Sequence, residues 1–157
     1  MWGFHTGFKF QFQKSKRMKN LVYVLMVTLI IAACKREENT PVEPIIEKVD
    51  SLSVITGTGK FSSTAGESVT GNAKIAMLEG KYSLVLDNFM TSNGPDLHVY
   101  LSKEATPNDF IDLGSLKSIS GTQVYPISGT PDFSQYKYAL IHCQQFNHLF
   151  GSAFLGE

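Results

Sequence analysis

Two cysteines, Cys34 and Cys143, are the residues of this 157-residue chain with the most distinctive chemistry. They allow at most one disulfide, which excludes a small domain held together by several cross-links. Cys143 lies five positions before His148, and His98 precedes both. A thiolate with two imidazoles is typical of copper sites, whereas a thiolate alone can act as a redox centre. A buried, unreactive thiol is the simpler alternative to both chemistries.

Cys34 closes a leader-like N-terminal segment. Five basic residues precede position 20 with no acidic residue among them: Lys9, Lys14, Lys16, Arg17 and Lys19. The apolar run Leu21–Ala33 has 13 residues, whereas a transmembrane helix needs about 20. A basic start, a short apolar run and small residues before a cysteine are typical of a secretory signal. We therefore predict a signal peptide over residues 1–33, with Met18 as a second candidate start.

The segment Ile31–Cys34 resembles the lipobox of bacterial lipoproteins, in which the cysteine is lipidated and becomes the first mature residue. The resemblance implies a membrane anchor on Cys34, because acyl chains bury about 0.8 kcal/mol per CH₂. A plain secreted protein is the alternative. We expect a cell-envelope location with the outer membrane favoured. Lys35–Glu38 resembles the surface-export signal of some Gram-negative lipoproteins, so exposure at the cell surface stays an open alternative.

Residues 34–51 contain two prolines and many charges, and they predict a flexible tether behind the lipid. The whole chain is formally neutral. Cleavage of the predicted signal peptide would remove five basic residues and would leave all 14 acidic residues in the mature chain. The mature chain therefore carries a net charge of −5, which argues against a nucleic-acid partner. The sequence also lacks a CxxC pair, a phosphate-binding loop and a Ser/His/Asp arrangement in a supporting context. We expect no hydrolase or nucleotide chemistry, and a non-enzymatic protein is favoured.

Residues 52–157 consist of short alternating runs separated by glycine- and proline-containing turns. The runs are Leu52–Phe61, Ser68–Leu78, Tyr82–Phe89, Leu97–Leu101, Phe110–Leu113, Thr122–Ile127, Tyr138–Cys143 and His148–Leu155. The second and third runs flank Glu79–Lys81 and predict a hairpin. This pattern predicts an all-β domain, an antiparallel β-sandwich of about eight short strands. The candidate core is Phe61, Leu84, Leu86, Phe89, Leu97, Val99, Leu101, Leu140, Ile141 and Phe150.

Three blocks of this domain together resemble the electron transfer DM-thirteen family, found in bacterial lipoproteins and in animal Skeletor-like proteins beside DOMON domains. The blocks are Asn93–Ser102, Ile111–Lys117 with Gly121–Tyr125, and Ile141–Asn147 with Phe150–Ala153. The resemblance covers about residues 55–156. It implies a β-sandwich and a single redox cysteine, which Cys143 matches. The residues that match the family pattern are Pro95, Asp96, Leu97, Phe146, Phe150 and Gly151. His142 and His148 depart from it, because the family often has an aromatic and an aliphatic residue there.

With Cys34 lipidated, Cys143 has no partner for an internal disulfide. The leading hypothesis is a redox centre that forms a sulfenate, or a mixed disulfide with an unidentified envelope protein. His142 is not expected to assist the thiol, because adjacent strand residues point to opposite faces. The first alternative is a non-catalytic binding or structural lipoprotein with Cys143 in its core. The second is a cupredoxin-like copper carrier using His98, Cys143 and His148, with Met77 or Met90 as the axial ligand.

Four further residues have simpler expected roles. We expect His98 to be solvated, because it alternates with apolar neighbours. Asp96 follows Gly94–Pro95 and is expected to cap a turn through its carboxylate. Tyr100 and Tyr125 are candidate electron-relay aromatics near Cys143, with ordinary packing as an equally good explanation. Apart from the copper alternative, no cofactor is expected.

Overall fold

The structure is a computed structural model, and it describes residues 40–49, 51 and 53–156. The predicted signal peptide and the predicted lipidation site, Cys34, lie outside the described residues. No helix in the described part is long and apolar enough to cross a membrane.

The described part of the chain is all-β, as predicted. Its nine strands are β1 (Ile45–Ile46), β2 (Val54–Ser63), β3 (Val69–Leu78), β4 (Lys81–Thr91), β5 (Leu97–Ser102), β6 (Phe110–Ser115), β7 (Ser120–Ile127), β8 (Tyr138–Cys143) and β9 (His148–Phe154). The eight predicted runs correspond to β2–β9. The two-residue strand β1 lies where a tether was predicted.

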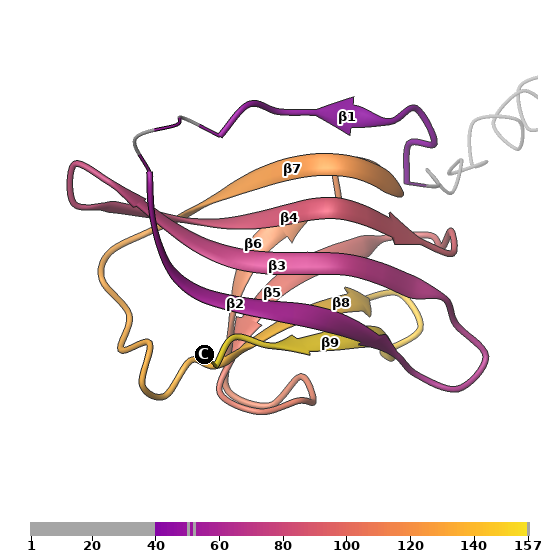
Figure 1. The fold of residues 1–157 in the computed structure, drawn as a ribbon. Coiled ribbons are helices and arrows are strands. Elements are labelled where there is room, and N and C mark those ends of the chain that lie inside the picture. The colour runs from indigo at the N-terminus through magenta and orange to yellow at the C-terminus, as the bar shows by residue number, and fades with distance from the viewer. Residues whose placement is uncertain (1–39, 50, 52, 157) are drawn as a thin grey trace, which may run out of the picture. The chain divides into compact units, whose positions relative to one another are not determined.

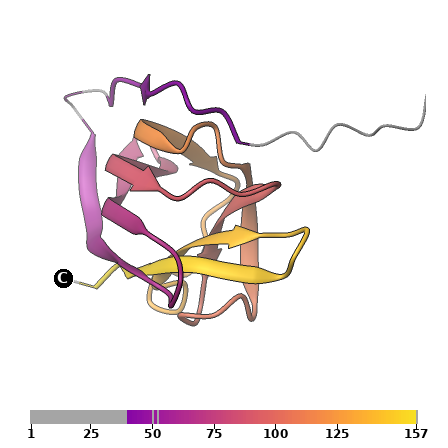
Figure 2. The same ribbon diagram turned by 90° about the vertical axis from the view of Figure 1, so that its right-hand side faces the viewer.

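The strands form one curled sheet in the order β1-β7-β4-β3-β2-β9-β8-β5-β6 (Figures 1 and 2). Every neighbouring pair is antiparallel except β1 and β7, which are parallel. Strand β2 belongs to both halves of the sheet, because Val54–Lys60 pairs with β3 and Phe61–Ser63 pairs with β9. The two expected layers are therefore halves of one continuous sheet that bends along β2.

The predicted hairpin is the β3–β4 pair, whose register runs from Val69 opposite Thr91 to Leu78 opposite Lys81. Its turn consists of Glu79 and Gly80, with φ angles of 49° and 75°. Two successive residues with positive φ match the right-handed twist of the flanking strands. The sequence signal for this turn was correct because glycine takes positive φ without steric cost.

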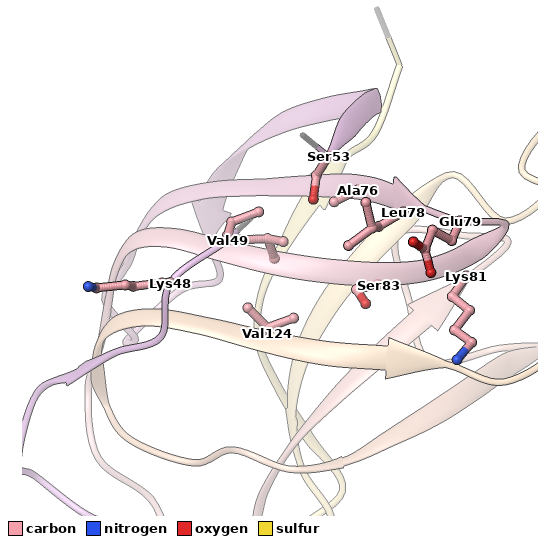
Figure 3. A pocket seen from close by; sticks show the side chains of 10 residues that line it. Lys48, Val49, Ser53, Ala76, Leu78, Glu79, Lys81, Ser83 and Val124 are labelled. Atoms are coloured by element: carbon pink, nitrogen blue, oxygen red, sulfur yellow. The ribbon is translucent and has the colours of Figure 1, made fainter. Parts of the chain in front are cut away.

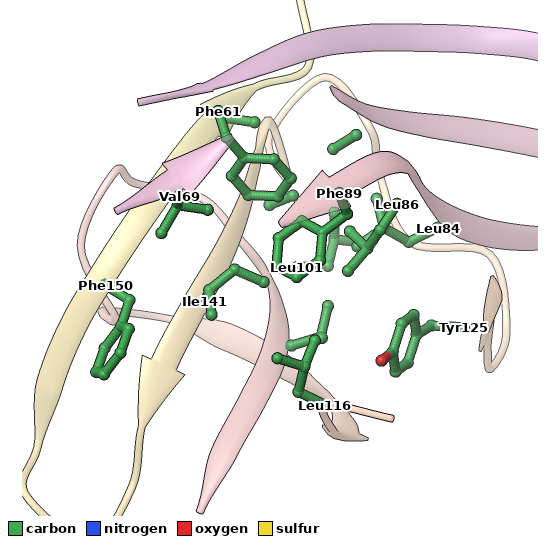
Figure 4. Packing of buried hydrophobic residues seen from close by; sticks show 14 of the residues in the cluster. Phe61, Val69, Leu84, Leu86, Phe89, Leu101, Leu116, Tyr125, Ile141 and Phe150 are labelled. Atoms are coloured by element: carbon green, nitrogen blue, oxygen red, sulfur yellow. The ribbon is translucent and has the colours of Figure 1, made fainter. Parts of the chain in front are cut away.

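The core lies between the two halves of the sheet, where side chains from both halves interdigitate (Figure 4). All ten predicted core residues are buried. Leu140 is the exception in position, because it lies outside the central cluster while its neighbour Ile141 lies within it. Consecutive strand residues face opposite sides, so the outer face of β8 is also covered. That covered outer face belongs to the candidate site described below.

Residues 40–47 lie along the edge of β7, and we call them the N-terminal strap (β1 and the chain before it in Figure 1). Ile45 and Ile46 pair with Gly121 and Thr122. Gly121 has φ +110°, and a Cβ there would lie 1.8 Å from the Ile45 carbonyl oxygen, so a larger residue would displace the strap. The strap falls within the predicted tether of residues 34–51. It is extended, as prolines favour, but it is bonded to the domain.

Candidate functional site

Cys143 is the last residue of β8, and its side chain belongs to the central core cluster. It is a free thiol with 1% of its surface exposed. Its Sγ–H donates a hydrogen bond to the Pro95 carbonyl oxygen at 3.2 Å. The thiol is therefore enclosed by core side chains on one side and by the turn before β5 on the other.

The turn over the thiol, residues 93–96, is fixed by local contacts. Asn93 Oδ1 accepts a hydrogen bond from the Gly94 amide at 2.8 Å. A Cβ on Gly94 would lie 2.8 Å from the Phe150 ring, so glycine lets the turn approach the core closely. Asp96 adopts a φ of 67°, a region that aspartate tolerates better than most residues. The Asp96 carbonyl oxygen accepts a hydrogen bond from the backbone amide of Gln144 at 3.0 Å, which connects the turn to the chain after Cys143.

A polar cluster lies on the opposite face of β5. His98 Nδ1 lies 3.0 Å from Asp112 Oδ2, and its Nε2 lies 3.2 Å from Asp96 Oδ1. Gln144 Nε2 lies 2.9 Å from both Asp112 Oδ2 and Tyr100 Oη. The His98 side chain is 14% exposed, so it is enclosed rather than solvated as we expected. The Asp96 carboxylate contacts His98, and within the described residues no hydrogen bond joins it to the backbone of the turn, where a cap was expected.

Three rings stack across β6, β5 and β8 beside this cluster. The Phe110 and Tyr100 rings are 4.1 Å apart at 12°, and the Tyr100 and His142 rings are 5.3 Å apart at 29°. Phe110 is 40% exposed, whereas Tyr100 is 2% exposed. Burial raises the pKa of the Tyr100 hydroxyl; the Gln144 hydrogen bond opposes this shift and nearby carboxylates add to it. The stack runs from the surface at Phe110 to the residue that precedes Cys143.

His142 is 4% exposed, and among the residues that the structure describes neither of its ring nitrogens has a hydrogen-bond partner of good geometry. Burial lowers the pKa of its imidazole, the nearby Asn147 side chain partly offsets the shift, and the charges of His148 and His98 lower it further. The ring therefore favours its neutral form. His142 and Cys143 face opposite sides of β8, in agreement with the expectation that this histidine does not assist the thiol.

The three residues of the copper alternative do not converge. Cys143 faces the core, whereas His98 is held by carboxylates on the outer face. His148 lies opposite Cys143 in the β8–β9 register, but its Nε2 lies 3.2 Å from Glu67 Oε1. Among the residues that the structure describes, no group of three or more His, Cys, Asp or Glu is placed to hold a metal ion.

Two of the remaining family-pattern residues, Phe150 and Gly151, are closely packed, whereas Phe146 is exposed. Phe150 is 5% exposed and meets Gly94, as described above. Gly151 lies so close to β2 that a Cβ would be 2.7 Å from the Ser62 carbonyl oxygen. Phe146 is 65% exposed in the β8–β9 turn. Tyr125 lies on β7, where its hydroxyl donates to Gln123 Oε1 at 2.8 Å, away from the Phe110–Tyr100–His142 stack.

Sequence reasoning missed Asp112, Gln144 and the strap residues Thr40 and Glu47. Asp112 and Gln144 come from strands or turns far from His98 in the chain, and no spacing rule links them. The alternation within Leu97–Leu101, the first run after the hairpin, places His98 and Tyr100 on one face, and this was the available signal. The strap residues gave no signal, because their contacts are mostly with the backbone.

The fold and the site define a small all-β domain with one enclosed thiol beside a stack of three rings. The model of the family described as Electron transfer DM13 matches residues 60–155. The chain therefore belongs to this family, as the sequence resemblance indicated. Comparisons with curated proteins and with solved structures find no match.

Proposed function

We propose that the protein is an envelope-anchored lipoprotein whose domain serves as a redox or electron-transfer accessory centred on Cys143. Membership of a family described as electron transfer supports a redox-related role. The observation that carries the proposal is the free Cys143 thiol itself, whose Sγ–H bonds to the Pro95 carbonyl of the turn that covers it. The anchor is the lipid on Cys34, and the partner is an envelope protein.

The proposed chemistry is a thiol–disulfide exchange. Once the turn has opened, the Cys143 thiol gives its proton to water and the thiolate attacks one sulfur of a partner disulfide. A mixed disulfide forms as the partner's S–S bond breaks, and the partner's second sulfur leaves as a thiolate that takes up a proton from solvent. A thiol that is 1% exposed cannot meet a disulfide without a local movement. The Pro95 carbonyl covers the sulfur, so the turn of residues 93–96 must open first.

Reversible oxidation under native conditions tests this function. The full-length protein in detergent is equilibrated with reduced and oxidised glutathione, quenched and cleaved with trypsin. Cleavage after Lys137 releases residues 138–157, which contain Cys143 and no second cysteine. We expect a glutathione mixed disulfide on this peptide that disappears when the reduced form is in excess. A thiol that stays unmodified until urea unfolds the protein contradicts the redox function.

The second candidate is a non-catalytic binding or structural lipoprotein with Cys143 as a core residue. The 1% exposure of the thiol within the central cluster favours it. A small buried thiol is a common core residue with no chemical role. The same experiment separates the two functions, because only the redox function requires modification of the folded protein.

A further inference from the structure

The strap reaches the turn that covers Cys143. Thr40, at the start of the strap, is 6% exposed, and its Oγ1 donates to the Gly94 carbonyl oxygen at 3.2 Å. The carbonyl of the next residue, Pro95, accepts the Cys143 thiol. A single residue step along the turn therefore separates the strap contact from the thiol contact.

A second connection runs through the chain between β6 and β7. The Ile119 amide donates to the Pro41 carbonyl, and the Ile119 carbonyl accepts the Thr91 amide, both at 2.9 Å. The Leu116 amide donates to the Leu97 carbonyl at 2.6 Å. Thr91 and Leu97 flank the turn on either side. Residues 116–119, which bind the strap through Ile119, therefore also bind the chain at both ends of the turn of residues 93–96.

Polar contacts hold the strap, and little apolar surface is buried beneath it. Val42 is 65% exposed and Ile46 is 82% exposed. Just after the strap, Lys48 and Val49 form one wall of a groove of about 390 Å³ over β3, β4 and β7 (Figure 3). Segments with few buried apolar contacts open locally at a lower free energy than the core. We therefore expect the strap to open at a lower free energy than the strands of the core.

Glu47, near the end of the strap, contacts both a side chain and the backbone of the domain. Lys117 Nζ lies 2.8 and 2.9 Å from the two carboxylate oxygens, and the Val124 amide donates to Oε2 at 2.6 Å. The Glu47 and Lys117 side chains are 35% and 36% exposed, so water screens part of their attraction. Loss of this carboxylate charge would weaken the strap without creating a cavity in the core.

We propose that the strap is a gate for Cys143: when bound along β7 it keeps the turn of residues 93–96 closed over the thiol, and when detached it lets that turn open. The inference rests on the proposed redox function, because it names what controls the reactive group. It assigns Thr40 and Glu47 as positioning residues that act on the thiol through the turn. The main support for the gate is a pair of hydrogen bonds to adjacent residues of the turn. Thr40 bonds to the Gly94 carbonyl, and Cys143 bonds to the Pro95 carbonyl.

The test is the rate at which iodoacetamide alkylates Cys143 in the folded, full-length protein in detergent. Glu47→Gln and Thr40→Val each weaken the strap at a different end and leave the core unchanged. Asp87→Asn is the matched control, because Asp87 forms an equivalent partly buried pair with Lys74 on β3, away from the strap. We expect both strap variants to be alkylated about 3–10-fold faster than the wild type, and the control to be unchanged.

Urea unfolding of each variant separates gating from general destabilisation. A gate predicts that alkylation of the strap variants accelerates more than their fall in unfolding midpoint accounts for, with a rate that depends only weakly on low urea concentrations. Equal rates in the strap variants and in Asp87→Asn overturn the gate while leaving the redox function standing. Faster alkylation without reversible glutathione modification overturns the redox function while leaving the gate standing.

Discussion

Replacement of Cys143 by serine or alanine tests whether the thiol is packed as the structure has it. Serine places a hydroxyl in the core cluster, which costs about 1–3 kcal/mol when a polar group is buried without a partner. The Pro95 carbonyl oxygen is within hydrogen-bond reach, and that bond returns about 1 kcal/mol. We therefore expect Cys143→Ser to lower the free energy of unfolding by about 1 kcal/mol.

Cys143→Ala tests the same packing without a polar group. It removes a buried sulfur and leaves a small cavity, for which we expect a loss of about 1–2 kcal/mol. For a domain of this size, 1 kcal/mol corresponds to a fall in melting temperature of about 4 °C. Two substitutions of different chemistry are therefore expected to have similar effects, because the serine retains the hydrogen bond that the alanine loses.

Urea unfolding of a lipid-free chain beginning at Glu37, followed by circular dichroism, measures both effects. This start retains the strap. Met90→Ala is the control, because Met90 is 60% exposed and its truncation is expected to change stability by less than about 0.5 kcal/mol. If both Cys143 variants unfold within 0.5 kcal/mol of the wild type, as surface substitutions do, the thiol is not packed in the core and the reasoning is refuted.

Three further predictions concern the surroundings of the site. Burial alone would raise the pKa of Glu47, but hydrogen bonds from Lys117 and the β7 backbone outweigh burial and lower that pKa. The contribution of the Glu47 carboxylate to folding stability is therefore complete above the usual value of 4.5, and it is lost as the pH falls through the lowered folded-state pKa. Urea midpoints measured across this range should fall less steeply for Glu47→Gln than for the wild type, and equal slopes would contradict the assignment. Tyr100→Phe leaves Gln144 without one acceptor and should lower the free energy of unfolding by about 1 kcal/mol, whereas a gain in stability would show that the bond contributes nothing. Gly151→Ala forces a methyl group against the β2 backbone and should cost about 1–3 kcal/mol in urea unfolding, and a neutral result would mean that β2 and β9 separate easily.

The strands and core were predictable because each run obeys a period of two. Leu97, Val99 and Leu101 alternate with polar or aromatic residues, and all three lie in the central cluster. The turn of Glu79 and Gly80 was predictable for a local reason, since glycine next to a short loop favours positive φ. Local rules succeeded wherever the structure depends on neighbouring residues.

The continuity of the sheet and the polar cluster were not predictable in the same way. A bend along β2 depends on pairing with β3 and β9, which lie on opposite sides of it in the sheet. The enclosure of His98 requires Asp112 from β6 and Gln144 from the turn after β8, and these meet only after the strands pair. The strap was missed because proline and charge are typical of linkers, while its bonds are made largely by backbone groups.

The binding of Thr40 to the turn also limits how far the domain could lie from a lipid on Cys34. If Cys34 carries the lipid, six residue steps separate the anchor from Thr40, and a fully extended chain of that length spans about 20 Å. A tether free to residue 51 would instead reach about 60 Å. With the proposed lipid on Cys34, the bound strap would therefore cut the reach of the domain from its anchor to about a third of that of a free tether.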